Sequence, residues 1–303
     1  MTKTTAWYRK GAVLFFGGLL AASSLLFVGC GGDSGQSGSS STPMTAEKAE
    51  DGRAKLSPYI SATNQYNGKM VTFAFSIQPS LEDLRSGEQM THISLPDFDI
   101  LQKDLKDARQ KSSGFDDVDK AADEVLAALK DLAPLATKME GYYSAKTYLS
   151  DGYAQAEADR QQYLPLYDKF TAAYESFNSL VDKHNEDLQA AQLEAMKKAG
   201  KKNTALFLEI GLKASHIVDE LAKPTYDAAA VEQQLKDLES LNNALDSEEA
   251  KSYKRDMNSF IGEVREYLAS GDDAKKFNDM VEEYNDTIDT ANRMDTSKLD
   301  SQK

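Results

Sequence analysis

Apolar residues recur every three or four positions along most of this chain. One run begins at Val118 and continues through Ala122, Val125, Leu129, Leu132, Ala136, Met139 and Tyr143. A longer run with the same step extends from Tyr153 to Ala195. An average spacing of 3.5 residues is typical of helices that pack side by side at a shallow angle. The pattern predicts two long helices joined by a turn at 150–152, with a kink or a boundary at Pro165.

Shorter runs of the same kind occur on both sides of this pair. We expect helices from about Thr45, over 97–110, and at four later stretches that contain Phe207, Val231, Tyr253 and Phe277. Between 71 and 77 apolar and polar residues alternate as in a strand. No partner strand is evident, so we expect the helix to continue to about Ser76 and a loop to follow over 78–96.

These elements predict an all-α protein, an elongated antiparallel helical bundle with long coiled-coil-like helices. We place the bundle domain at 47–296. The polar end, 297–303, is expected to fray.

The N-terminal segment has the pattern of a secretory signal. Lys3, Arg9 and Lys10 precede an uncharged, mostly apolar run from Gly11 to Val28. An uncleaved transmembrane helix is the alternative, because the run is just long enough to span a bilayer.

Cys30, the single cysteine of the chain, follows this run directly. The segment resembles a bacterial lipobox, although Phe27 stands where leucine is usual and Val28 where a small residue is usual. The resemblance implies a signal peptide at 1–29, lipidation of Cys30 and attachment to a membrane through that residue. Gly31, in place of the aspartate that retains lipoproteins in the inner membrane, implies an outer-membrane anchor facing the periplasm. Residues 30–46 form a Gly/Ser-rich linker.

The negative charge of the chain argues against partners that are themselves strongly negative. The full chain has a formal net charge of −14, and loss of three basic residues with 1–29 leaves 32 basic against 49 acidic residues, or −17. Such an acidic body repels nucleic-acid backbones, so we expect no nucleic-acid partner. One cysteine also allows no internal disulfide.

Two segments resemble the YiiG-like bacterial lipoprotein family, a domain of unknown function. The first is YISATNQYN at Tyr59–Asn67, and the second is YYSAKTYLSDGYA at Tyr142–Ala154. The resemblance implies a helical envelope protein and brings no known activity with it.

His216, Asp219 and Glu220 are the candidate metal ligands. Their i, i+3, i+4 spacing places an imidazole and two carboxylates on one helix surface. A complete site needs further ligands, and His92 and His184 are distant in sequence. An exposed helix edge is the simpler interpretation, and we expect no metal or other cofactor.

Tyr143, Lys146 and Tyr153 could line a polar pocket near the turn between the two long helices. They could equally be tyrosines whose hydroxyls reach water at the end of a bundle.

No sequence signature of catalysis occurs: there is no P-loop, nucleophile elbow, dinucleotide turn or HExxH. We therefore expect a non-enzymatic interaction or structural module with a protein partner in the envelope. The alternative hypothesis is a periplasmic module that binds a metal or a small ligand.

Overall fold

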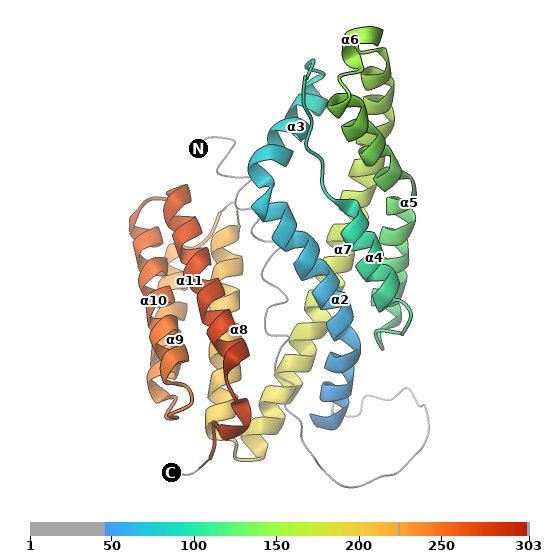
Figure 1. The fold of residues 1–303 in the computed structure, drawn as a ribbon. Helices are drawn as coiled ribbons and strands as arrows, with labels where there is room; N and C mark the ends of the chain where they lie inside the picture. Colours follow the sequence, from blue (N-terminus) through green and yellow to red (C-terminus); the bar gives the residue numbers. More distant parts are fainter. Residues whose placement is uncertain (1–45, 224, 302–303) are drawn as a thin grey trace. The chain divides into compact units, whose positions relative to one another are not determined.

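The computed structural model describes residues 46–223 and 225–301, and within this part the protein is helical and has no strand (Figure 1). The chain divides into two compact units, one at 52–186 and one that contains 187–303. The predicted all-α helical bundle is confirmed. The bundle that we placed at 47–296 as one domain is divided between the two units.

The unit at 52–186 holds two long antiparallel helices with a short helix at their junction (Figure 1). It contains α3, α4, α5 and α6, most of α2 and the first part of α7. Their bounds are α2 Ala46–Thr72, α3 Ala74–Ser86, α4 Phe98–Ala108, α5 Asp116–Ser144, α6 Tyr148–Asp151 and α7 Ala154–Lys198. Both predicted long helices are present, and α7 continues through Pro165. The eight apolar positions predicted for α5, from Val118 to Tyr143, are all buried.

The segment 71–96 differs from the prediction. The first helix breaks at Phe73, and α3 then continues through Pro79 to Ser86. We predicted a loop from residue 78 because proline removes a backbone donor from a helix interior. The helix ends instead at Gly87, whose φ of 79° places it in the left-handed region and whose N–H bonds to the carbonyl of Asp83.

Aromatic side chains from three helices fill the interior of this unit. The ring of Tyr66 on α2 lies 6.5 Å from Phe98 on α4 and 6.1 Å from Phe170 on α7, between ring centroids. The Tyr174 hydroxyl donates to Asn67 Oδ1 at 2.7 Å within this interior. Large rings fill the wide spaces that separate helices of this length.

The unit at 187–303 contains the end of α7 and four further helices. These are α8 Lys202–Ala222, α9 Ala228–Ala244, α10 Lys251–Ala269 and α11 Ala274–Arg293, followed by the 3₁₀ turn η1 Thr296–Lys298. Their buried faces share one core of aliphatic and aromatic residues. Asp227 caps α9 and Asp273 caps α11, each by accepting two backbone N–H groups.

The structure describes residues 297–301 of the tail that we expected to fray, and the chain packs against the body through Leu299. Leu299 is 1% exposed. The Asp300 carboxylate accepts the backbone N–H of Asn203 at 2.6 Å and that of Thr204 at 3.1 Å. A carboxylate at a helix N-terminus is favoured by the helix dipole, which explains why this polar end is ordered.

None of the helices in the described ranges combines the length and the hydropathy that a bilayer crossing requires. The predicted signal peptide, the lipidation site Cys30 and nearly all of the linker lie outside the described residues and stay predictions.

Candidate functional site

The junction of α5 and α7 is built by the segment Tyr142–Tyr153, which we call the tyrosine tip. The chain leaves α5 at Lys146, where φ is 53°, and enters α7 through Gly152 and Tyr153, where φ is 60° and 69°. The N–H of Thr147 bonds to the Tyr142 carbonyl at 3.1 Å, and that of Lys146 to the Tyr143 carbonyl at 3.0 Å. This pair of bonds is a Schellman motif with lysine in place of the usual glycine. A left-handed conformation costs a residue with a Cβ about 1 kcal/mol, so two positions of the tip are strained.

Asp151 holds the tip together through three hydrogen bonds. Its Oδ1 accepts the Tyr142 hydroxyl at 2.7 Å and the Tyr153 N–H at 3.0 Å, and its Oδ2 accepts the Gln155 N–H at 3.2 Å. The Tyr142 hydroxyl, above all, lowers the pKa of Asp151. Desolvation, followed by the bond to Asp151, raises the pKa of Tyr142 to about 12. The carboxylate therefore joins the end of α5 to the first turn of α7.

The tyrosine rings of the tip contact one another in series. Tyr143 lies 6.1 Å from Tyr148 in a tilted arrangement, and Tyr148 lies 5.1 Å from Tyr153 with an interplanar angle of 18°. The Leu149 side chain is 76% exposed. The next most exposed large apolar side chain in the described part of the chain is Phe73, at 54%. The tip thus presents an apolar group on a well-defined support.

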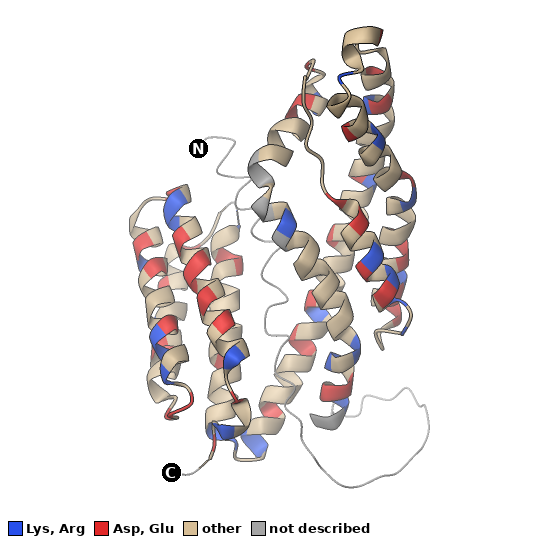
Figure 2. Ribbon diagram, in the orientation of Figure 1, with Lys and Arg blue, Asp and Glu red and all other residues tan. Residues whose placement is uncertain are grey.

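The tip carries little charge for a protein this acidic. Lys146 and Asp151 are its two charged residues. Figure 2 shows a largely tan ribbon at α6, whereas blue and red recur along α5 and α7. The exposed residues of this segment include Ser144, Ala145, Lys146, Thr147, Leu149 and Ser150, whereas Tyr142, Tyr143 and Tyr148 are buried.

The structure brings the predicted pocket residues Tyr143, Lys146 and Tyr153 to this same tip. Tyr143 is 6% exposed and packs among other tyrosine rings, whereas Lys146 is exposed. Sequence reasoning missed Asp151 as the organising group and Leu149 as the exposed apolar residue. The Asp-Gly pair that follows a helix could have indicated the role of Asp151. The sequence spacing of Leu149 does not differ from that of leucines in the core.

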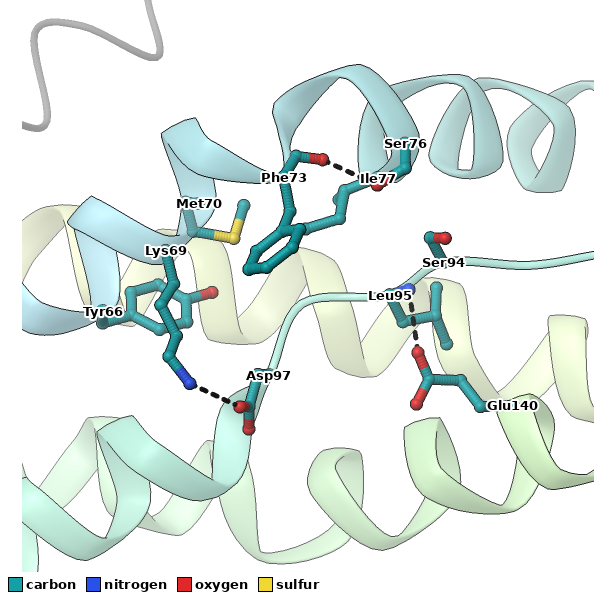
Figure 3. Close-up of a pocket in the computed structure, with 10 residues that line it drawn as sticks. All are labelled: Tyr66, Lys69, Met70, Phe73, Ser76, Ile77, Ser94, Leu95, Asp97 and Glu140. Atoms are coloured by element: carbon teal, nitrogen blue, oxygen red, sulfur yellow. Dashed lines mark hydrogen bonds and ion pairs between the residues drawn. The ribbon is translucent and has the colours of Figure 1, made fainter.

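A second feature of the same unit is a groove of about 210 Å³ at the break between α2 and α3. Figure 3 shows Met70, Phe73 and Ile77 on one side and Leu95, Asp97 and Glu140 on the other. The remaining lining residues are Tyr66, Lys69, Ser76 and Ser94. Lys69 pairs with Asp97 at 3.1 Å, and Glu140 Oε1 accepts the Leu95 N–H at 3.1 Å. The groove therefore has an apolar interior and a charged rim.

The candidate metal ligands do not assemble into a site. His216 is exposed on α8, and Glu220 forms an ion pair with Lys223. Within residues 46–223 and 225–301, no group of three or more His, Cys, Asp and Glu side chains is arranged to hold a metal ion.

Two polar pairs elsewhere in the unit tie helices together. Lys138 Nζ lies 2.6 Å from Oδ1 of the buried Asp159, which joins α5 to α7. His184 Nε2 lies 2.9 Å from both carboxylate oxygens of Asp117, and its ring stacks on Phe115 at 4.0 Å. Both pairs connect neighbouring helices, which is a structural role. His184 lies at the edge of the apolar face of α7, where Asp117 and Phe115 hold its side chain.

Comparison with known proteins places the chain among proteins without an assigned activity. Uncharacterized protein YiiG of Escherichia coli strain K12 is 25% identical over 178 residues, which are 58% of this chain and 49% of that protein. The chain thus spans about half the length of this curated relative. No solved structure matches the chain. Residues 50–298 match the model of the family described as "Protein of unknown function (DUF3829)". This match covers most of the chain and agrees with the YiiG-like resemblance, and the chain belongs to the DUF3829 family of proteins of unknown function.

Proposed function

We propose that this protein is a lipid-anchored, non-enzymatic interaction module of the cell envelope. In this proposal Cys30 carries the lipid, the anchor lies in the outer membrane because Gly31 follows, and the helical body faces the periplasm. Two or more acyl chains give stable membrane attachment. In the proposal, residues 30–46, which are rich in glycine and serine, connect the lipid to the helical body.

The partner surface in this proposal is the tyrosine tip, and the exposure of Leu149 is the observation that carries it. A leucine that is 76% exposed contributes little to folding, yet two strained backbone positions and the Asp151 hydrogen bonds define its place. An exposed apolar side chain on a well-defined support can serve as an anchor that enters a pocket of a partner. The partner is a protein with an apolar pocket for Leu149 and a carboxylate beside it for Lys146.

Crosslinking of intact cells tests the surface. We expect a discrete adduct between the wild-type chain and one envelope protein, lost in Leu149→Gln and kept in Leu149→Met, which preserves the apolar contact. Ser240→Gln, an exposed change on α9, is the control for nonspecific effects. Adducts of equal yield from the wild type and Leu149→Gln would refute the tip as the partner surface.

Mass spectrometry of the purified chain tests the anchor separately. The expected N-terminus is Cys30 with lipid attached to its thiol and amino group. Trp7 is the only tryptophan, so the mature protein is also expected to lack tryptophan fluorescence. An intact leader and an unmodified Cys30 thiol would contradict the lipid anchor. That result would not affect the tip proposal, which the crosslinking experiment tests.

The alternative function is a ligand-binding module, either for a metal ion or for a small molecule. The metal form has no support within the described residues, where His216, Asp219 and Glu220 gather no further ligands. The small-ligand form is supported by the groove between α2 and α3.

A further inference from the structure

The groove at the break between α2 and α3 has the hydroxyl of a buried tyrosine that points into it without a partner. Tyr66 is 4% exposed, and Figure 3 shows its oxygen pointing toward Phe73 inside the groove. Among the residues that the structure describes, no group hydrogen bonds to this oxygen, which is accessible from the groove. Burial raises the pKa of Tyr66 well above its ordinary value of 10.0, so the hydroxyl stays neutral. A hydroxyl that opens into the groove can donate a hydrogen bond to a ligand that supplies an oxygen.

The walls of the groove favour an apolar body of ring size. Met70, Phe73, Ile77 and Leu95 supply the apolar surface, and Phe73 is 54% exposed at the entrance. A protein cavity of about 150 Å³ is large enough to bind benzene. The 210 Å³ here can hold a six-membered ring together with a short arm.

The charge at the rim favours a cation over an anion. Lys69 and Asp97 neutralise each other at 3.1 Å. Glu140 has no cationic partner in the described part of the chain, and its Oε1 is engaged only by the Leu95 N–H. The lining therefore carries one uncompensated negative charge, which repels a carboxylate or phosphate and attracts an ammonium group.

We propose that this groove binds small amines with a ring-sized apolar body, whose ammonium group pairs with Glu140 and whose far end presents an oxygen to the Tyr66 hydroxyl. Phe73 covers the body of the ligand from the solvent side. The site is separate from the tyrosine tip and does not depend on the proposed function.

Three probes that share a phenylethyl body separate the contacts. Tyramine has the ammonium group, the ring and the phenolic oxygen. 2-Phenylethylamine lacks the oxygen, and 3-(4-hydroxyphenyl)propionate replaces the ammonium group with a carboxylate. We expect tyramine to bind with a Kd on the order of 1 mM, as for a ligand of about ten heavy atoms. 2-Phenylethylamine is expected to bind about threefold to tenfold more weakly, and the carboxylate not at all.

The measurement is a titration of the full chain in lipid nanodiscs, followed through ¹³C-labelled methionine methyl groups. Met70 lies in the groove and reports binding, whereas Met257, buried in the core of α8–α11, is the internal control. The Met70 signal is assigned with Met70→Leu. Tyramine is expected to shift the Met70 resonance saturably and to leave Met257 unchanged. Equal shifts at both methionines, or no shift at Met70, would overturn the proposal.

Three variants complete the test. Glu140→Gln keeps an acceptor for the Leu95 N–H and removes the charge, so both amines are expected to weaken about threefold to fivefold. Asp131→Asn, an exposed carboxylate on the same helix, is the matched control and is expected to have no effect. Tyr66→Phe leaves no polar group unpaired and is expected to make tyramine and 2-phenylethylamine bind equally. The assignment is wrong if Asp131→Asn weakens the amines as much as Glu140→Gln, or if Tyr66→Phe preserves the preference for tyramine.

Discussion

The helices α8–α11 and the unit at 52–186 use their apolar residues differently. In α8–α11 the large apolar side chains enter one core, two helices begin at aspartate caps and the C-terminal Asp300 covers a third helix N-terminus. In the unit at 52–186 a helix breaks at the exposed Phe73, and a strained turn presents the exposed Leu149. Both apolar side chains that stand out as exposed in the described chain belong to this second unit.

The difference separates a region built for stability from one that carries candidate sites. In natural proteins, local conformational preferences, burial and hydrogen bonding mostly agree with the fold, and the exceptions tend to occur at functional sites. The departures in the unit at 52–186 are a lysine and a tyrosine in left-handed conformations and an exposed leucine. The other unit has a left-handed residue at Asp272 and a buried, unpaired hydroxyl at Tyr253, so the exposed apolar side chains are what distinguishes the two regions. The following variants test whether the two regions differ in this way.

The largest expected effect is a cavity in the core of α8–α11. Phe260 on α10 is 0% exposed and packs 5.4 Å from Tyr284. Phe260→Ala is expected to lower the free energy of unfolding by about 3–5 kcal/mol in urea denaturation. A loss below about 1 kcal/mol would mean that this core is not tightly packed.

Loss of a helix cap in the same unit is expected to cost less. The Asp227 carboxylate accepts the N–H groups of Ala229 and Ala230 at 2.9 and 3.2 Å. Asp227→Ala is expected to destabilise by about 1 kcal/mol, and Asp227→Asn, which keeps the acceptor, by less. Equal losses in the two variants would argue against the cap.

Relief of strain at the tip is expected to have the opposite sign. Lys146 has a φ of 53°, which glycine adopts without penalty. Lys146→Gly is expected to stabilise the protein by about 0.5–1 kcal/mol and to weaken crosslinking to the partner, because the cation is lost. A destabilised variant would show that Lys146 is retained for folding rather than for recognition.

The hydrogen bond between Tyr142 and Asp151 makes the tip depend on pH in two directions. The folded pKa of Asp151 is lowered from its ordinary value of 3.8, so its contribution is present above pH 3.8 and is lost as pH falls through the folded pKa. The pKa of Tyr142 is raised from 10.0 to about 12, so its contribution is present below pH 10 and is lost as pH rises toward 12. Tyr142→Phe is expected to raise the Asp151 pKa in a carboxyl-carbon NMR titration. An unchanged value would mean that the hydroxyl does not donate to Asp151.

The smallest expected effect on stability is at Leu149. Because this side chain is 76% exposed, Leu149→Gln is expected to change the free energy of unfolding by less than about 0.5 kcal/mol. A larger loss in urea denaturation would mean that Leu149 packs against the body, and would remove it from the candidate surface.

Periodicity was sufficient to predict the long helices, but it missed α6 and most of α3, and it gave neither the helix ends nor the exposed residues. The spacing from Val118 to Tyr143 identified α5 and its buried face, since burial of one face repeats with the helix period. The C-terminal tail was not predictable, because Asp300 meets Asn203 and Thr204 only after the chain has folded. The candidate pocket at Tyr143, Lys146 and Tyr153 identified the tip through its aromatic residues. Leu149 and Tyr66 could not be selected, since exposure and an unpaired hydroxyl are properties of packing rather than of spacing.

The most direct test of the central claim is site-specific photocrosslinking in living cells. A photoreactive phenylalanine analogue at position 149 is compared with the same analogue at position 240, an exposed site on α9. The account predicts one discrete partner band from position 149 and none from position 240. A band from position 240 with none from position 149 would contradict the assignment of recognition to the tyrosine tip.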